Sequence, residues 1–325
     1  MSNIITPSTK QGPDGDMQSL FFVIGAVRSG TTVFRLMLDA HPNITNPGES
    51  DFIFDHLRED PRTDDWICDL ERLQLDRVFQ RHNLRAPSSA CGRQLVLDVV
   101  EQLQKRAPKY LCLVVHGNAD KVARIFPDCK IIHLVRDPRD VAYSCIGMGW
   151  AGNTYFGVDL WRETEKNWDL AKHLFKKTNI LELRFKKLIE HPRAELQRVC
   201  SFLDIPFSES MLNYSNNSNY GPPNPGAIEQ WRRNRDRRAI ALVEVKVRDL
   251  LLDRGYDLSG YPLDPPGPLE RLRLAWENKA YKWEFGCRRY GPVNFFVEKL
   301  TRRLAKPFHP FFFKRMADID QLHLK

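Results

Sequence analysis

LFFVIGAVRSGTT, residues 20–32, is the stretch that decides the fold of this chain. Its first five residues are apolar and predict a buried strand, and the glycine-bounded loop after them predicts a turn into a helix. Such a turn directs backbone N–H groups at an anion, and the dipole of the helix N-terminus adds to the attraction. The spacing Gly25-x4-Gly30 fits a phosphate-binding loop, although Thr31 stands where the nucleoside triphosphate-binding form carries lysine. We therefore expect a site for a phosphate-like group in which Arg28 is the nearby cation.

A second segment, about a hundred residues further along the chain, predicts another anion site. Residues 130–136 (KIIHLVR) indicate a buried strand that ends in Arg136, and Asp137 is a suitable N-cap for the helix that follows. Ser144 lies eight residues beyond Arg136, a distance of about two helical turns. Because ligands bind at the carboxyl ends of the strands in an open α/β sheet, we expect Arg136 and Ser144 at that edge. Arg139 falls on the other side of the turn and is expected to face water.

Strand and helix patterns alternate through most of the chain. Besides the strand of the second motif, strands are expected at residues 22–25 (the first strand), 110–115 and 180–185. Helices are expected at residues 32–40, 52–85, 94–106, 120–126, 160–176, 193–203 and 227–253. This alternation predicts an α/β fold with a parallel sheet.

The two anion segments, in this order, resemble the sulfotransferase superfamily that uses 3′-phosphoadenosine 5′-phosphosulfate (PAPS). The resemblance is to the Arg-Ser-Gly-Thr-Thr branch, which includes the tyrosylprotein and bacterial sulfotransferases, and it covers roughly residues 20–255. Further matching segments are Pro47-Gly48-Glu49, Phe126-Pro127-Asp128, residues 183–188 (LRFKKL), His191-Pro192 and Cys200-Ser201-Phe202-Leu203. The resemblance implies a three-layer α/β/α fold of the P-loop type with a central parallel sheet. It also implies PAPS as the sulfuryl donor, 3′-phosphoadenosine 5′-phosphate (PAP) as the product and a hydroxyl-bearing acceptor of unknown class.

The resemblance assigns roles to particular residues. The 5′-phosphosulfate would be bound by the first motif, which comprises Arg28, Ser29, Gly30, Thr31 and Thr32. The 3′-phosphate would be bound by Arg136 and Ser144, with Arg232 returning to it after a loop rich in proline and asparagine. Phe185 would stack near the adenine, at a position where relatives often have tyrosine.

Two residues are candidates for catalysis. Glu49 matches the family glutamate after the first helix and would accept the proton of the acceptor hydroxyl, a role typically worth about 10²–10⁴-fold in rate. His116, at the end of an expected strand, is the alternative base. Relatives carry near this position a lysine that stabilises charge on the leaving phosphate, and it has no clear counterpart here. Lys121 is close in sequence but is expected on a helix.

Each of these assignments has a structural alternative that the sequence leaves open. The first motif can be a tight turn with a buried threonine pair, and Arg136 can form an ion pair with Asp140. Glu49 can cap a helix before Ser50 and Asp51, and His116 can be a buried structural residue. The five arginines between residues 232 and 238 can form a solvated helix face.

Composition narrows the class of protein. A chain of 325 residues with 42% hydrophobic residues can form one large α/β domain with an appendage. Its apolar runs are shorter than the roughly 18 residues that span a membrane. Seven scattered cysteines without a Cys-x-x-Cys pair favour reduced thiols in a cytoplasmic protein. We expect no metal site and no nucleic-acid partner, because neither a ligand cluster nor a binding motif is recognisable.

Positive charge is concentrated at the C-terminal end. Residues 269–325 carry 13 Lys and Arg against 6 Asp and Glu, so they hold +7 of the net +8. Aromatic residues, among them Trp276 and Trp283, interrupt this basic segment. A basic, aromatic-rich amphipathic segment suits an anionic membrane surface, but packing on the body or on a second subunit is the alternative that we favour. Both alternatives stay open. The protein expected in the cytoplasm can therefore be either free or peripheral at a membrane.

We therefore expect three parts and one main activity. The parts are a disordered leader at residues 1–17, a sulfotransferase domain at 18–260 and a basic, aromatic-rich helical extension at 261–325. The expected activity is direct in-line transfer of a sulfuryl group from PAPS to a hydroxyl, with a carboxylate as general base. The alternatives are a nucleotide-dependent kinase on the same P-loop scaffold and a non-catalytic, membrane-associated nucleotide-binding module.

Overall fold

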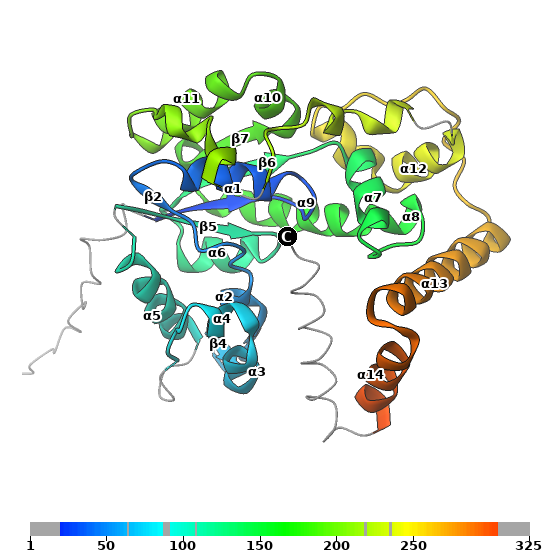
Figure 1. Cartoon of the computed structure of the whole chain (residues 1–325), viewed down its shortest axis with the longest axis horizontal. Coiled ribbons are helices and arrows are strands. Elements are labelled where there is room, and N and C mark those ends of the chain that lie inside the picture. Colours follow the sequence, from blue (N-terminus) through cyan, green and yellow to red (C-terminus); the bar gives the residue numbers. More distant parts are fainter. Residues whose placement is uncertain are drawn as a thin grey trace, which may run out of the picture.

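A five-stranded parallel sheet forms the centre of the protein (Figure 1). The computed structural model describes residues 20–304 except 64, 87–91, 108, 218–219 and 234–235, so the expected leader and residues 305–325 lie outside the described residues. The strand order is β2-β5-β1-β6-β7, and every neighbouring pair is parallel. The strands are β1 (Leu20–Ile24), β2 (Ile44–Thr45), β5 (Tyr110–Val115), β6 (Lys130–Val135) and β7 (Ile180–Arg184).

Helices cover both faces of the sheet, because the strands are apolar on both sides. In β1, Phe22 and Ile24 pack with α5, α6 and α9, while Phe21 and Val23 pack with α1, α10 and α11. The bounds are α1 (Thr31–Asp39), α5 (Gly92–Gln104), α6 (Ala119–Ile125), α9 (Asp159–Ala171), α10 (Phe185–Glu190) and α11 (Pro192–Leu203). The three-layer α/β/α fold with a central parallel sheet is thus confirmed.

The segment that was expected to be one helical region, residues 52–85, is instead broken into short elements. They are α2 (Phe52–Asp55), β3 (Leu57–Glu59), β4 (Trp66–Cys68), α3 (Leu70–Leu75) and α4 (Arg77–Arg81), with β3 and β4 antiparallel. The side chains of Asp69 and Asp76 each accept hydrogen bonds from backbone N–H groups at a helix start. These caps begin a new helix at each aspartate and explain why a single helix does not form.

Five further helices complete the described chain. They are α7 (Pro138–Gly147) and α8 (Thr154–Gly157), which follow β6, and α12 (Arg237–Asp253), α13 (Pro268–Tyr290) and α14 (Pro292–Leu304) at the C-terminal end. Helix α12 begins ten residues later than expected, because the Asp236 carboxylate caps it at the Ala239 N–H and residues 225–233 form 3₁₀ turns instead. Short 3₁₀ helices lie at Lys172–Leu174, Lys177–Asn179, Glu209–Met211, Tyr214–Asn217, Pro225–Ala227 and Gln230–Arg233. Among the described helices, none is both long and apolar enough to cross a membrane.

A buried charge cluster joins the sheet to the helices α9 and α12. Glu165 of α9 is fully buried and lies 3.2 Å from Nε2 of His133 in β6. The same carboxylate accepts a hydrogen bond from the guanidinium of Arg254, the residue that follows α12. Burial alone would raise the pKa of Glu165, but His133 and Arg254 outweigh it and lower that pKa below its ordinary value. The carboxylate therefore stays ionised at neutral pH, and its stabilising contribution is lost as the pH falls through this lowered pKa.

Glu165→Gln tests this cluster. We expect the free energy of unfolding to fall by about 3 kcal/mol, because loss of one buried partner leaves the Arg254 charge poorly compensated. Urea unfolding at pH 7, followed by tryptophan fluorescence, measures the change. Glu163→Gln on the same helix is the matched control, since Glu163 is 67% exposed and should contribute less than about 0.5 kcal/mol. Equal effects of the two substitutions would contradict a stabilising role for the buried cluster.

Candidate active site

The first anion motif forms a tight loop between β1 and α1. At Gly25, a Cβ atom would lie 2.6 Å from the carbonyl oxygen of Leu134, so glycine allows β1 and β6 to approach closely. Gly30 has φ +92°, and a Cβ atom there would lie 2.2 Å from the ring of Phe185. These two glycines shape the loop that we call the phosphate loop, residues 25–30. Helix α1 follows it directly, with its first N–H groups at the loop.

The two anion motifs contact each other directly. Nε of Arg28 donates to Oγ of Ser144 at 2.9 Å, and Nη1 of Arg136 donates to the carbonyl oxygen of Arg28 at 2.7 Å. Because β1 and β6 are adjacent, with Ile24 opposite His133, both motifs leave the same edge of the sheet. The structure thus brings together residues that are 108 and 116 positions apart.

Arg136 is buried without a counter-ion among the described residues. Its side chain is 8% exposed, no described carboxylate lies within ion-pair distance, and its Nε has no hydrogen-bond partner. Burial lowers the pKa of Arg136, and the charge of Arg28 adds to this effect, while Asp140 and Asp137 oppose it. The alternative ion pair with Asp140 is not formed, since Asp140 accepts instead from the backbone N–H of Trp231. A buried guanidinium in this state suits an anionic ligand.

Three of the expected nucleotide-binding residues line one cavity of about 270 Å³. Arg136 lies over the ring of Phe185, with its guanidinium carbon 4.6 Å from the ring centroid, and Arg232 lines the same cavity. The Arg232 side chain is 55% exposed and pairs with Glu229 at 3.2 Å. Arg136 and Phe185 therefore form a fixed inner wall, whereas Arg232 is an exposed cation at the rim.

Arg139 was expected to face water, and this expectation is wrong. Its side chain is 2% exposed and donates to both oxygens of Asp137 and to Glu244 of α12. The guanidinium carbon of Arg139 lies 3.7 Å from the ring centroid of Trp231. The two carboxylates draw this arginine into the interior, where it holds α12 against α7.

Asp51, His116 and Thr31 form a hydrogen-bonded chain at the edge of the sheet. Nδ1 of His116 lies 2.7 Å from Oδ2 of Asp51, and Nε2 lies 3.2 Å from Oγ1 of Thr31 at the start of α1. The Asp51 carboxylate also accepts from the backbone N–H of His116 at 2.7 Å, which fixes the ring orientation. Asp51 is a site residue that was not predicted from the sequence. Its place two residues after Glu49, in the same loop, was the available signal.

The chain of hydrogen bonds favours the charged form of His116. Burial alone would lower the pKa of His116, but the hydrogen bond and charge of Asp51 outweigh it, and Glu49 and Asp55 add to their effect. The net result is a pKa above the ordinary value for histidine. His116 therefore presents a positively charged donor toward the phosphate loop over a wider pH range than a free histidine would.

Glu49 lies beside the end of β5, where it forms a parallel bridge with Val114. The residue is exposed and is not a helix cap, since α2 begins after Asp51. The Nζ of Lys121 is engaged by the backbone, because it donates to the carbonyl oxygens of Phe54 at 2.8 Å and Leu57 at 3.0 Å. Glu49 is thus an accessible carboxylate, whereas Lys121 has a structural role.

The remaining residues of the first motif differ in exposure. Ser29 is fully buried, its Oγ has no hydrogen-bond partner, and Thr32 is half-buried on the first turn of α1. Ser29 is thus packed inside the loop, whereas Thr32 is the more accessible hydroxyl at the start of α1.

Known structures with this architecture include two sulfotransferase domains. The chain superposes on the sulfotransferase domain of the Synechococcus PCC 7002 olefin synthase with a TM-score of 0.56 and 22% identity, covering 77% of this chain and 100% of that one. For the sulfotransferase domain of the curacin biosynthetic pathway the TM-score is 0.54 at 18% identity, covering 73% of this chain and 98% of that one. At 22% and 18% identity, these two comparisons show a shared fold and nothing beyond it.

Sequence relatives extend the comparison. A protein-tyrosine sulfotransferase of Drosophila melanogaster is 26% identical over 80% of this chain, and protein-tyrosine sulfotransferase A of Caenorhabditis elegans is 28% identical over 59%. The chain spans 58% and 52% of the length of these two relatives. The profile described as "Sulfotransferase family" matches residues 21–209, which include both anion motifs, Glu49 and His116. The chain therefore belongs to the sulfotransferase family.

Proposed function

We propose that this protein transfers a sulfuryl group from PAPS to a hydroxyl acceptor. The observation that carries the proposal is the direct contact of the two anion motifs, through Arg28 with Ser144 and Arg136 with Arg28. PAPS carries two anionic groups, a 5′-phosphosulfate and a 3′-phosphate, so it needs two adjacent anion sites. Membership of the sulfotransferase family supports this donor.

In the proposed complex each end of PAPS has its own set of residues. The phosphate loop and the hydroxyls of Thr31 and Thr32 bind the 5′-phosphosulfate, and Phe185 stacks on the adenine. Arg136 binds the 3′-phosphate, which supplies the counter-ion that this buried guanidinium lacks among the described residues. Ser144 and the rim residue Arg232 complete that subsite.

The proposed reaction is an in-line displacement at sulfur. The acceptor oxygen forms a bond to sulfur while the bond between sulfur and the bridging phosphate oxygen breaks, and PAP leaves with that electron pair. Glu49 accepts the acceptor proton, since it is an exposed carboxylate beside the end of β5 whose charge acts on His116. The imidazolium of His116, held by Asp51 and contacting Thr31, stabilises the negative charge that develops on the leaving phosphate.

This arrangement assigns to His116 the charge that a lysine provides in relatives. Lys121 cannot supply it, because its ammonium is bound to two backbone carbonyls. The raised pKa of His116 and its contact with the donor side favour this role over that of the base. A phenolic hydroxyl is the first acceptor to test, because the similar curated proteins are named protein-tyrosine sulfotransferases.

Transfer itself is tested with sulfur-labelled PAPS and a panel of phenols and tyrosine peptides. We expect the protein to label a phenolic acceptor and Glu49→Gln to lower kcat by about 10²–10⁴-fold, because the proton acceptor is lost. PAP affinity should stay unchanged in this variant. The matched control is Glu71→Gln at an exposed position on α3, which should retain full turnover. Unchanged kcat in Glu49→Gln would remove Glu49 as the base.

Arg136→Ala tests the 3′-phosphate subsite. We expect PAP affinity to fall by about 10- to 100-fold, the usual cost of losing a charge-assisted hydrogen bond. Binding of adenosine 5′-phosphosulfate, which lacks the 3′-phosphate, should change much less. Calorimetric titration with both nucleotides gives the comparison, and equal losses would place Arg136 outside the subsite.

The role of His116 predicts a particular pH profile. If the charged form is needed, kcat falls as the pH rises through the raised pKa of His116. Asp51→Asn removes the hydrogen bond and charge that raise this pKa, so the alkaline limb should move to lower pH. PAP binding at low pH shows whether the variant is folded. If kcat instead falls as the pH drops through the pKa of His116, the neutral form is the active one, and His116 would be the base.

A further inference from the structure

Helix α13 is held on the protein body along one side. The backbone N–H of Gly152 donates to Asn278 at 2.7 Å, and Asn153 donates to the carbonyl oxygen of Leu274 at 2.8 Å. At Gly149, a Cβ atom would lie only 2.1 Å from the ring of Phe285, so this glycine admits the ring. These contacts fix α13 on the connection between α7 and α8 and leave its opposite side uncovered by the described residues.

The uncovered side of α13 carries large apolar residues in a stripe. Leu269, Leu272, Trp276 and Trp283 are 84%, 69%, 68% and 41% exposed. Their spacing of three, four and seven residues places them on one side of the helix. Lys279 occupies the gap in this stripe, so a cation lies among the apolar side chains.

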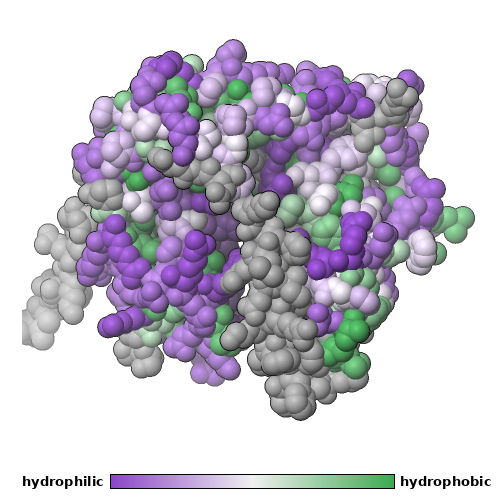
Figure 2. All heavy atoms as spheres, in the orientation of Figure 1, coloured by the Kyte–Doolittle hydropathy of each residue, from purple (hydrophilic) through white to green (hydrophobic). Residues whose placement is uncertain are grey.

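Helix α14 extends the same pattern. It packs on α13 where Phe295 lies against Gly286, at which a Cβ atom would be 2.2 Å from the ring. Val293, Phe296 and Leu300, again at spacings of three and four, are 73%, 46% and 57% exposed. In Figure 2 hydrophobic side chains appear in green at the start of α13 and over α14.

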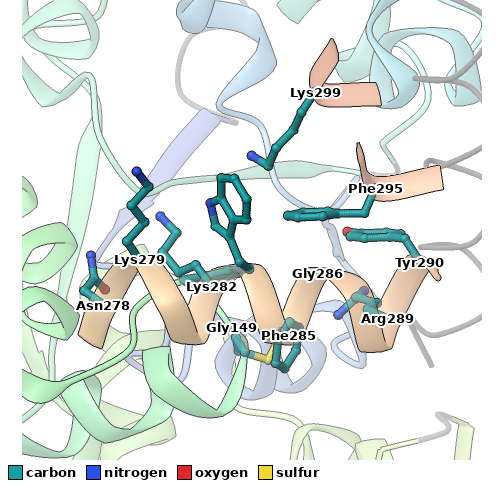
Figure 3. Close-up of a pocket in the computed structure, with 13 residues that line it drawn as sticks. Gly149, Asn278, Lys279, Lys282, Phe285, Gly286, Arg289, Tyr290, Phe295 and Lys299 are labelled. Carbon is teal, nitrogen blue, oxygen red and sulfur yellow. The ribbon is translucent and has the colours of Figure 1, made fainter. Parts of the chain in front are cut away.

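A cavity of about 590 Å³ lies between these helices and the turn after α7. Its cations are Lys279, Lys282, Arg289 and Lys299, and no described lining residue is acidic. In Figure 3, Lys279 and Lys282 rise from α13 on the side from which Lys299 descends from α14. None of these three lysines pairs with a carboxylate in the described part of the chain. The cavity therefore has the charge of an anion site and, through Trp283 and Phe295, apolar walls.

We propose that α13 and α14 dock this protein on the surface of an anionic phospholipid bilayer. The cavity accepts the phosphate-bearing headgroup, and the two apolar stripes insert between neighbouring lipids. Basic side chains near an anionic membrane gain electrostatic attraction, and exposed tryptophans favour the interface because their rings are amphipathic. The seven exposed apolar residues thus contribute hydrophobic insertion, and the lysines contribute electrostatic attraction to the same surface.

A second copy of this chain fits the surface less well. A symmetric dimer through α13 would place the basic surfaces of two copies against each other, and its axis near Lys279 would bring the same lysines together. Residues 269–325 hold a net charge of +7, so two such segments repel each other. An anionic bilayer removes this repulsion and covers the apolar stripes at the same time.

Vesicle flotation of the full chain tests the proposal. Vesicles of phosphatidylcholine alone are compared with vesicles that also contain phosphatidylserine, at low and high salt. We expect at least tenfold tighter binding to the anionic vesicles, weakened by salt. Lys279→Glu combined with Lys282→Glu should lower this binding at least tenfold, and Leu272→Ala combined with Trp276→Ala should weaken it at all salt concentrations.

The matched control combines Lys109→Glu with Lys166→Glu, two exposed positions on the body with the same change of charge. This control should bind vesicles like the wild type, and all variants should bind PAP like the wild type. Three results would overturn the proposal: equal binding to neutral and anionic vesicles, no vesicle binding, or equal losses in control and test variants. Self-association that Leu272→Ala with Trp276→Ala abolishes, without vesicle binding, would assign the surface to a second copy.

Discussion

The close approach of β1 and β6 is the constraint on which the rest of the site depends. It requires a glycine at position 25, because the Leu134 carbonyl leaves no space for a Cβ atom. With the strands in this register, the carbonyl of Arg28 meets the guanidinium of Arg136, and the Arg28 side chain reaches Ser144. The phosphate loop is therefore held by the segment that carries Arg136 and Ser144. Neither segment would have its geometry without the other, so the two motifs form one structural unit.

Counter-ions distinguish two structural arginines of this protein from Arg136, for which a ligand-binding role is proposed. Arg139 and Arg254 are as buried as Arg136, but each contacts two carboxylates. Burial of a charge is costly unless it is compensated, so these paired arginines need no ligand. Arg136 has only carbonyl oxygens and an aromatic ring as partners among the described residues. This difference is the reason for proposing Arg136 as a ligand of an external anion.

The sequence was sufficient for features whose cause is local. Strand β1, its glycine loop and the Asp137 cap depend on neighbouring residues, and the parallel sheet follows from their alternation with helices. The sequence failed where a distant partner decides the outcome. Arg139 is buried because it pairs with Glu244, which is 105 positions away in the sequence. His116 likewise pairs with Asp51, which is 65 positions away. The assignments of Glu49, His116 and the nucleotide contacts are predictions, because they depend on groups of the substrate as well as on groups of the protein.

The central claim is that the two adjoining anion motifs form a site for a nucleotide with both a 5′- and a 3′-anion. Calorimetric binding of PAP and of ATP, each with and without magnesium, tests it most directly and requires no acceptor. The account predicts tight PAP binding that is independent of magnesium, and weak ATP binding under both conditions. Magnesium-dependent ATP binding without preference for PAP would contradict it and would favour a kinase on the same scaffold.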